Sequence, residues 1–222
     1  MQGKVPLQFL KDIDNFSTAQ EHGRGGFSVG TLPYGKVIAV KRLQAMTGTQ
    51  EEQFEAELNV LMKLQHKNIV KLLGYCDEKQ EHVREGAGSK EKLLCYEYLP
   101  NGNLGKMLSE SGDLDWNSRF RIIKGICSGL HYLHEEWDSN PVIHFDFKPS
   151  NILLDSKLIS VFQGYLVKNK PKFCINKVTG SIGDIAPEYY RTGEISVKSD
   201  IFSLGTQKLG THISNCIKVS IS

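Results

Sequence analysis

The sequence has few cysteines, and their spacing argues against a disulfide-rich scaffold and against a zinc site. The 222 residues include five cysteines, an odd number, and no two of them form a C-x-x-C pair. A disulfide-rich secreted scaffold or a zinc site needs denser, paired spacing. We therefore expect reduced, buried thiols of a cytosolic protein. The five positions are Cys76, Cys95, Cys127, Cys174 and Cys216.

Long apolar runs and an excess of either charge are also missing. No stretch approaches the roughly 20 apolar residues that a membrane-spanning helix requires. The N-terminal segment MQGKVPLQFLKDIDNF lacks the apolar centre of a signal peptide. Lys and Arg together number 27 against 25 Asp and Glu, a formal net charge of +2, which argues against a nucleic-acid partner. The sequence as it stands predicts a cytoplasmic globular protein without a membrane span.

The first part of the chain predicts mainly strands. Apolar runs rich in β-branched or aromatic residues predict strands at 37–43, 69–76 and 92–99. Apolar residues at helical spacing predict one helix over 51–65. The charged, glycine-containing segment 77–92 is interpreted as an exposed loop.

After Pro100 the pattern becomes helical. The longest predicted helix covers 118–136, with one apolar stripe that we expect to be buried. The stripe consists of Phe120, Ile123, Ile126, Leu130 and Leu133. A short polar connection at 99–103 joins the two parts. The sequence therefore predicts two lobes with a hinge, a common location for a ligand.

Two features of the first part suggest phosphate chemistry. Gly23, Gly25 and Gly26 would let backbone N–H groups approach phosphate oxygens, although a hairpin turn is the more common reason for such a cluster. Lys41 ends an apolar strand, where a buried ammonium needs a partner. Glu57 on the predicted helix can pair with it and hold it against nucleotide phosphates. The alternative is a lysine that reaches solvent at the end of the strand.

A third feature is the segment VIHFDFKPSNILLD at 142–155. The Asp146 carboxylate can orient a hydroxyl and accept its proton, and Lys148 can stabilise a transferring phosphoryl group. Asn151 can ligate Mg²⁺. The alternative is a polar turn around Pro149 and Ser150, which would not favour this set of chemical types.

These features and several longer motifs resemble the eukaryotic protein kinase family, and more narrowly a plant receptor-like Ser/Thr kinase of the cysteine-rich receptor-like type. The matching motifs, which cover most of residues 10–205, are NFSTAQEHGRGGF, GTLPYGKVIAVKRL, FEAE, LQHKNIVKLLGYC, LCYEYLPNGNL, LDWNSRFRIIKGICSGLHYLH, HFDFKPSNILLD, TGSIGDIAPEYY and ISVKSDIFSLG. The resemblance implies an α+β, bilobal protein-kinase-like fold, in which the N-lobe is an antiparallel β-sheet with one helix and the α-helical C-lobe is incomplete. It implies a juxtamembrane-like segment at 1–20, an N-lobe at 21–98, a partial C-lobe at 99–205 and a divergent tail at 206–222.

The resemblance also implies a role for each matching position. The residues expected to bind ATP are Gly23, Gly25, Gly26, Val29, Ala39, Lys41, Glu57, the gatekeeper Tyr96, and the hinge residues Glu97 and Leu99. Asp146 matches the catalytic base, Lys148 its accompanying lysine and Asn151 the Mg²⁺ ligand. The motif that closes the activation segment is matched by Ala186, Pro187 and Glu188, and the helix residue that braces the catalytic loop by Asp200.

The sequence departs from the family pattern within these motifs. Ser28 replaces a glycine of the nucleotide loop, which is also shortened. Phe145 replaces the arginine that pairs with a phosphorylated activation loop, as in kinases that need no such phosphorylation. Val161, followed by Phe162, stands where the family has its metal-binding Asp. Valine has no oxygen for Mg²⁺, so we expect binding of Mg²⁺ and ATP to be weakened or lost.

The segment after Gly205 lacks the family's long apolar helix, which predicts a C-terminally truncated domain with an uncovered apolar surface. Three hypotheses stay open. The chain is an active Ser/Thr kinase that transfers the γ-phosphate of ATP to protein hydroxyls, a pseudokinase that binds nucleotide or acts as a scaffold, or a non-functional fragment. The expected partners are ATP and a protein substrate or partner kinase, at the cytoplasmic face of the plasma membrane if the chain belongs to a longer receptor.

Overall fold

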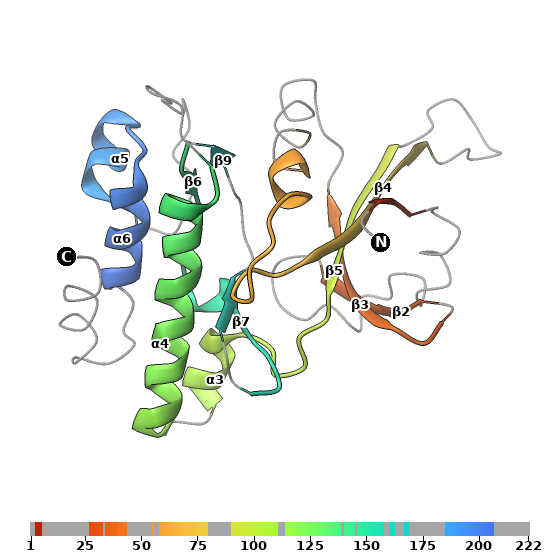
Figure 1. The fold of residues 1–222 in the computed structure, drawn as a ribbon, viewed down its shortest axis with the longest axis horizontal. Coiled ribbons are helices and arrows are strands. Elements are labelled where there is room, and N and C mark those ends of the chain that lie inside the picture. The colour runs from red at the N-terminus through yellow and green to blue at the C-terminus, as the bar shows by residue number, and fades with distance from the viewer. Residues whose placement is uncertain are drawn as a thin grey trace. The chain divides into compact units, whose positions relative to one another are not determined.

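The computed structural model divides the chain into two compact units, each described below by itself (Figure 1). The first unit comprises Met1–Lys63 and Lys71–Tyr98, and the second comprises Leu64–Val70 and Leu99–Ser222. The residues that the structure describes are 3–5, 27–32, 34–43, 55, 58–79, 90–110, 114–138, 140–144, 146–157, 160–162, 167–168 and 185–206. The lobe boundaries expected from the sequence stay predictions.

The first unit contains a five-stranded sheet with strand order β1-β4-β5-β3-β2. Its strands are β1 (Gly3–Lys4), β2 (Phe27–Thr31), β3 (Val37–Leu43), β4 (Leu72–Lys79) and β5 (Lys90–Glu97). The β2–β3, β3–β5 and β4–β5 pairs are antiparallel, and β1 joins the outer edge of β4 in parallel. The predicted strand at 37–43 and the antiparallel sheet are confirmed.

The exposed loop predicted over 77–92 is wrong at both ends. Strand β4 continues to Lys79 and β5 begins at Lys90, so the β4–β5 hairpin is longer than the apolar runs indicate. Asp77 pairs with Lys92 in this extension. A β-ladder is held by backbone hydrogen bonds, and these form as well between charged residues as between apolar ones. Of the predicted helix at 51–65, the structure describes Glu55 and 58–65, and Leu58 to Leu61 are helical.

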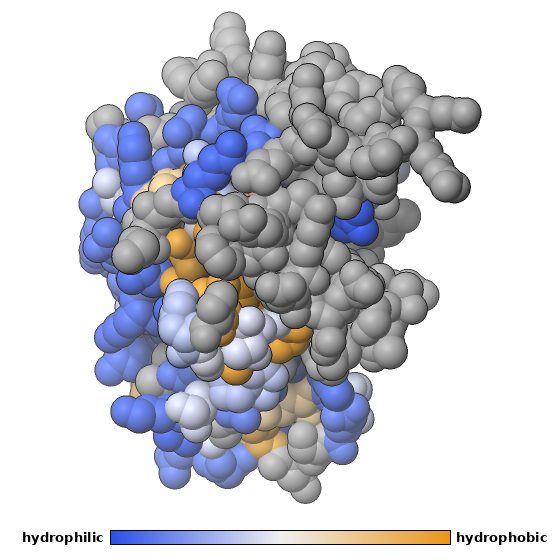
Figure 2. Space-filling view, turned by 90° about the vertical axis from the view of Figure 1, so that its right-hand side faces the viewer, coloured by the Kyte–Doolittle hydropathy of each residue, from blue (hydrophilic) through white to orange (hydrophobic). Residues whose placement is uncertain are grey.

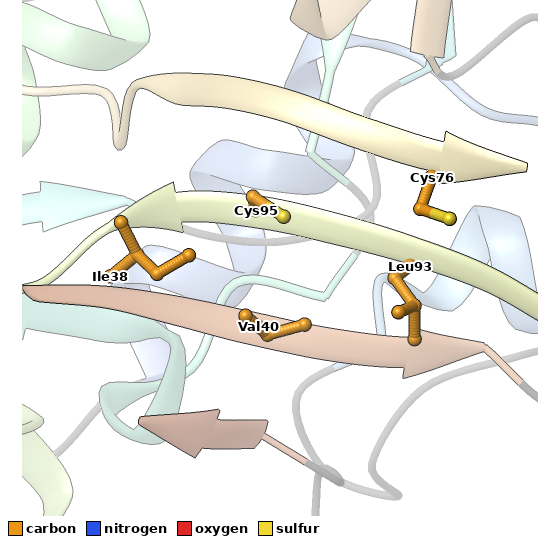
Figure 3. Packing of buried hydrophobic residues seen from close by; sticks show 5 residues of the cluster. All are labelled: Ile38, Val40, Cys76, Leu93 and Cys95. Carbon is orange, nitrogen blue, oxygen red and sulfur yellow. The ribbon is translucent and has the colours of Figure 1, made fainter. Parts of the chain in front are cut away.

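One face of the sheet carries a closed apolar core. Ile38, Val40, Cys76, Leu93 and Cys95 are at most 2% exposed, and Figure 3 shows them on neighbouring strands β3, β5 and β4. A β-bulge in β4 contributes to this packing, because Leu72 pairs with Tyr96 but Gly74 pairs with Cys95. Leu73, between them, packs against the core.

The cysteines of this core are free thiols, as is Cys127 in the second unit. Burial, with a smaller contribution from the neighbouring Cys76, raises the pKa of the Cys95 thiol to about 12. Because the thiolate is the reactive form, Cys95 behaves as a small apolar side chain. The expectation of a reduced, buried thiol holds at this position.

The second unit is mainly helical, with short strands around one loop. Its helices are α3 (Leu104–Glu110), α4 (Trp116–His131), the π-helix η3 (Tyr132–Glu136), the 3₁₀-helix η4 (Pro149–Asn151), α5 (Pro187–Thr192) and α6 (Val197–Thr206). Its strands are β6 (Val142–Ile143), β7 (Ile152–Leu154), β8 (Ser160–Phe162) and β9 (Val167–Lys168), which form the antiparallel pairs β6–β9 and β7–β8.

Helix α4 confirms the predicted long helix but corrects one face of it. Asp115 caps the helix by accepting the Ser118 N–H at 3.0 Å. The isoleucines and leucines of the predicted stripe are buried, whereas Phe120 is 49% exposed and the neighbouring Ile122 is 2% exposed. An α-helix turns once in about 3.6 residues, so Phe120 lies at the margin of the face that Ile126 and Leu130 define.

Among the residues drawn in colour in Figure 2, hydrophilic residues predominate, and apolar residues show between them near the centre and near the lower edge of the view. Within the described part of the chain, no helix has both the length and the apolar character needed to cross a membrane.

Candidate active site

The loop between β6 and β7 brings three predicted site residues together. Asp146 Oδ2 lies 2.7 Å from the Lys148 ammonium and accepts a hydrogen bond from Asn151 Nδ2 at 3.0 Å. The same Asn151 amide also donates to the Asp146 carbonyl oxygen at 2.7 Å. The side chains of Asp146 and Lys148 are each 31% exposed, so a substrate can reach them.

The local sequence explains this loop geometry. Val142 and Ile143 are at most 1% exposed and fix the start of the loop in the core. Pro149 occupies the first turn of η4, where its missing N–H costs no hydrogen bond, and this short helix turns Asn151 back toward Asp146.

The chemistry of the three residues fits transfer to a hydroxyl. Lys148 and Asn151 both contact the Asp146 carboxylate at Oδ2, and none of the described residues contacts Oδ1. A hydroxyl group placed at Oδ1 can pass its proton to the carboxylate as it attacks. The Lys148 ammonium is positioned to offset negative charge on a neighbouring phosphoryl group.

Asp200 anchors this loop from below. Its Oδ2 accepts the backbone N–H of His144 at 2.9 Å and lies 2.9 Å from His134 Nε2. Asp200 is 1% exposed, and a buried carboxylate is tolerated only when donors satisfy it. The predicted bracing role of Asp200 is consistent with this geometry. His134 was not expected, because it lies in the π-helix, 66 residues from Asp200.

Helix α3 packs behind the loop at a second unexpected position. A Cβ atom added to Gly105 would lie 3.3 Å from the Ser150 backbone nitrogen and 3.5 Å from the Pro149 carbonyl carbon. Asn103 begins this helix by accepting the Lys106 N–H at 2.8 Å and forms a bridge with Leu153 of β7. The glycine therefore permits close approach of α3 to the loop between β6 and β7.

The motif that is predicted to close the activation segment also meets the start of this loop. Helix α5 begins at Pro187, directly after Ala186. Ala186, Tyr189 and Ile195 form a buried cluster with Ile143 of β6. Phe145 lies outside the described residues.

In the first unit, the sheet places several predicted nucleotide residues on one face. Val29 pairs with Ala39, and Ala39 pairs with Tyr96, so these side chains form a row across β2, β3 and β5. Lys41, two residues after Ala39 on β3, shares that face. Val29, Ala39 and Lys41 are partly buried and Tyr96 is 3% exposed. This face is thus more open than the opposite face, which carries the closed core.

Glu97 has a structural function at the end of β5. Its side-chain Oε1 accepts the Lys71 backbone N–H at 2.7 Å, and its own N–H donates to the Lys71 carbonyl at 3.1 Å. The carboxylate is therefore occupied in holding the entry to β4, and a nucleotide would meet the backbone. Leu99 is partly buried and belongs to the second unit.

The remaining predicted nucleotide residues lie outside the described part of the chain. They are Gly23, Gly25, Gly26 and Glu57. The expected ion pair between Lys41 and Glu57 therefore stays a prediction.

The expected magnesium site lacks acidic ligands. Strands β7 and β8 form a hairpin in which Val161 is the central residue of β8, opposite Leu153. The sequence contains no Asp or Glu between Asp155 and Asp184. No group of three or more His, Cys, Asp or Glu side chains within the described ranges could hold a metal.

Asn151 does not compensate for this lack. Its Nδ2 is used by Asp146, which leaves one neutral amide oxygen for a metal. Protein-bound Mg²⁺ is usually held by one or two carboxylates in addition to phosphates. The residues present therefore do not fit the magnesium site that the family implies.

The comparisons with known proteins give the chain its family. Residues 16–209 match the protein kinase domain. The chain is 42% identical over 207 residues to a G-type lectin S-receptor-like serine/threonine-protein kinase of Arabidopsis thaliana. This match covers 86% of this chain and 24% of that protein. It is 40% identical over 207 residues to cysteine-rich receptor-like protein kinase 6 of Oryza sativa subsp. japonica, with 86% and 28% covered.

A solved structure supports the fold. It is that of the pseudokinase domain of BIR2, described as an immune regulator of the RLK/Pelle family, with a TM-score of 0.67 and 33% identity. The match covers 91% of this chain and 61% of that one. The protein-kinase-like fold predicted from the sequence is confirmed.

The chain spans about a quarter of the length of the curated relatives it matches. Lectin-type and cysteine-rich-type relatives match almost equally well, so the similarity does not separate these subgroups. The family match covers far more than half of the sequence, and the chain belongs to the protein kinase domain family, in which it is most similar to plant receptor-like Ser/Thr kinases.

Proposed function

We propose that this kinase domain binds an adenine nucleotide but transfers its γ-phosphate slowly or not at all. The observation that carries the proposal is the absence of any Asp or Glu between Asp155 and Asp184. Shifting the alignment of the β7–β8 hairpin cannot restore a carboxylate, because none is present in the whole segment. The proposal therefore does not depend on the assignment of Val161 to the metal-binding position.

The physical reason is electrostatic. Phosphoryl transfer depends on positioning and on neutralising the charge of the β- and γ-phosphates, which metal ions normally provide in this family. Without an anionic ligand, the domain has little to attract Mg²⁺ to the nucleotide. Asp146 and Lys148 then remain in place for a reaction whose phosphate partner is poorly oriented.

Nucleotide recognition has better support. The row formed by Val29, Ala39 and Tyr96 offers an apolar face for a base, and Lys41 on the same face offers a cation for phosphate. The similarity to a pseudokinase domain is in line with the absence of efficient transfer. In this role the domain acts on a protein partner, such as another kinase, rather than on a substrate hydroxyl.

We also place the domain at the cytoplasmic face of the plasma membrane, as part of a longer receptor. Its similarity to receptor-like kinases, of which it matches about a quarter, supports this placement. Co-fractionation of the full-length protein with plasma membrane, and protection of a tag on this domain from external protease, are the expected results. A soluble fraction that contains all of the protein would contradict them.

Nucleotide binding with and without Mg²⁺ tests the main proposal. We expect a fluorescent ATP analogue to bind with similar affinity in Mg²⁺ and in EDTA, and Lys41→Met to weaken binding about tenfold in both conditions because the phosphate-facing cation is lost. Lys36→Met, an exposed lysine in the β2–β3 turn, is the matched control. Affinity that rises steeply with Mg²⁺ would contradict the proposal.

An active Ser/Thr kinase is the second candidate, and the intact Asp146–Lys148–Asn151 cluster favours it. Incorporation of radiolabelled phosphate into the protein itself or into a general protein substrate distinguishes the two. If incorporation is substantial and Asp146→Asn abolishes it while Glu110→Gln does not, the active kinase is the correct function. We expect incorporation near background for all three proteins.

A further inference from the structure

The outward side of helix α4 carries an aromatic and basic surface outside the candidate active site. Trp116, Phe120 and Lys124 follow one another at every fourth position, and Arg121 lies beside them. Trp116 is 52% exposed and Phe120 is 49% exposed, and Arg121 and Lys124 are exposed as well. We call these four residues the α4 stripe.

The charged residues along helix α4 are all basic. The sequence contains no Asp or Glu between Asp115 and Glu135, whereas Arg119, Arg121 and Lys124 lie within that interval. Asp115 is occupied at the helix start, where its two carboxylate oxygens accept from the Ser118 N–H and hydroxyl. The Arg121 guanidinium donates to the same hydroxyl at 3.1 Å, which limits the orientations of this side chain.

The composition of the surface indicates the class of partner. Trp116 and Phe120 are each about half exposed, so each side chain is partly held by the domain and partly accessible to a partner. Partly ordered Trp and Arg side chains are typical of the residues that contribute most to protein interfaces. A second copy of this chain would bring Arg121 and Lys124 against like charges, which disfavours self-association through this surface.

We propose that the α4 stripe is a docking surface for an acidic protein segment that carries apolar side chains. The apolar side chains of the partner cover Trp116 and Phe120, and its carboxylates face Arg121 and Lys124. The partner site is independent of nucleotide binding and of phosphoryl transfer. A domain with little catalytic activity can use such a surface to hold a second protein.

Binding of designed probe peptides to the intact chain tests the surface. The first probe is a fluorescein-labelled amphipathic helical peptide with leucine along one side and glutamate on its flanks. The second has the same leucines with lysine in place of each glutamate. We expect the fluorescence anisotropy of the first to rise with protein concentration, and that of the second to stay unchanged. Equal binding of both peptides, or of neither, would overturn the proposal.

Variants locate the binding on the helix. Phe120→Ala and Lys124→Glu should each weaken binding of the acidic peptide about tenfold. Lys198→Glu on α6 makes the same change in net charge at an exposed position and should leave binding unchanged. If Lys198→Glu weakens binding as much as Lys124→Glu, the attraction is a property of the whole molecule and the stripe is not a site.

Vesicles separate a protein partner from a membrane. We expect no co-sedimentation of the chain with vesicles of phosphatidylcholine and phosphatidylserine beyond that with phosphatidylcholine alone. Co-sedimentation that Lys124→Glu abolishes, without binding of the acidic peptide, would assign the stripe to an anionic lipid surface and overturn the proposal. Circular dichroism of each variant checks that its helices are intact.

Discussion

The loop between β6 and β7 and the β7–β8 hairpin are adjacent in the chain, yet only the loop carries the polar residues that the kinase motif predicts. The loop holds Asp146, Lys148 and Asn151 in contact, whereas the segment between Asp155 and Asp184 contains no acidic residue. The contacts suggest a reason for the difference. Asp146 and Asn151 bond to one another and so stabilise the loop itself, while a metal-binding carboxylate serves only the metal.

This comparison separates two kinds of residue within one active site. A side chain that also supports the fold remains useful when catalysis is weak, because its loss would cost stability. A side chain with a purely catalytic function carries no such constraint. The presence of a catalytic Asp is therefore weaker support for activity than the presence of a metal ligand.

The largest change in stability is expected when the buried carboxylate of Asp200 is removed. Asp200→Ala leaves the His144 N–H and His134 without their common buried acceptor. We expect the free energy of unfolding to fall by about 3 kcal/mol, measured by urea denaturation. Glu110→Ala at the exposed end of α3 is the control and should change stability by less than about 0.5 kcal/mol. A similar small change for both variants would show that the loop does not depend on Asp200.

A carboxylate introduced into the β7–β8 hairpin tests whether the missing metal ligand limits nucleotide binding. The family alignment places Val161 at the position of the metal-binding Asp, and Val161 is the central residue of strand β8. We expect Val161→Asp to strengthen nucleotide binding in Mg²⁺ about tenfold, and Gln163→Asp, which adds the same charge two positions later, to have little effect. Isothermal titration with and without Mg²⁺ measures both, and the reverse order would assign the metal position to Gln163.

A smaller effect is expected at the contact between α3 and the loop. Gly105→Ala places a methyl group 3.3 Å from the Ser150 nitrogen and 3.2 Å from Asn103 Oδ1, so the loop or the helix must shift slightly. The shift is expected to cost about 1 kcal/mol, reduced by the better helix propensity of alanine. Gly205→Ala in α6, where an added Cβ meets nothing within 4 Å, is a matched control that should be neutral or stabilising.

The smallest effect is a pH dependence from His66. Burial lowers the pKa of His66 from its usual 6.5, and nearby Lys67 adds to this, while Glu136 opposes it. The Asn68 N–H donates to His66 Nδ1 at 3.2 Å. The His66 ring stacks on the Tyr132 ring, with the two ring centroids 4.8 Å apart. The unfolded chain then binds more protons than the folded one between the lowered pKa and 6.5, so stability falls as pH drops through this window.

The measurement is the urea midpoint between about pH 7 and pH 5. We expect a decrease for the native sequence that is smaller in His66→Gln, because glutamine does not titrate. The other histidines serve as the background in both proteins. An identical pH profile for the two would exclude His66 as the source.

The sequence predicted the parts of this structure that are encoded locally. The strand at 37–43 and helix α4 follow from apolar periodicity, and Asp146, Lys148 and Asn151 stand within six residues of one another in a distinctive motif. The charged extension of the β4–β5 hairpin was not predicted from the sequence. Its length is set by backbone pairing between the two strands and not by the character of the side chains.

The supports of the site were harder to predict because they are distant in the sequence. His134 and Asp200 are 66 positions apart, and Gly105 meets the loop at Pro149 and Ser150. Nothing in the residues near His134 or Gly105 indicates these partners. Phe120 was assigned to the core since it is apolar and near the buried stripe, but the helix turns it outward.

The two-residue strand β1 has a consequence for handling this protein. Gly3 and Lys4 pair with Gly74 and Tyr75, and the Val5 N–H donates to the Tyr75 carbonyl at 2.8 Å. These residues occupy backbone groups on the outer edge of β4 that would otherwise be available to another strand. A version of the chain shortened past Val5 would present that edge, together with part of the apolar core that Val5 covers, and is expected to aggregate more readily at high concentration.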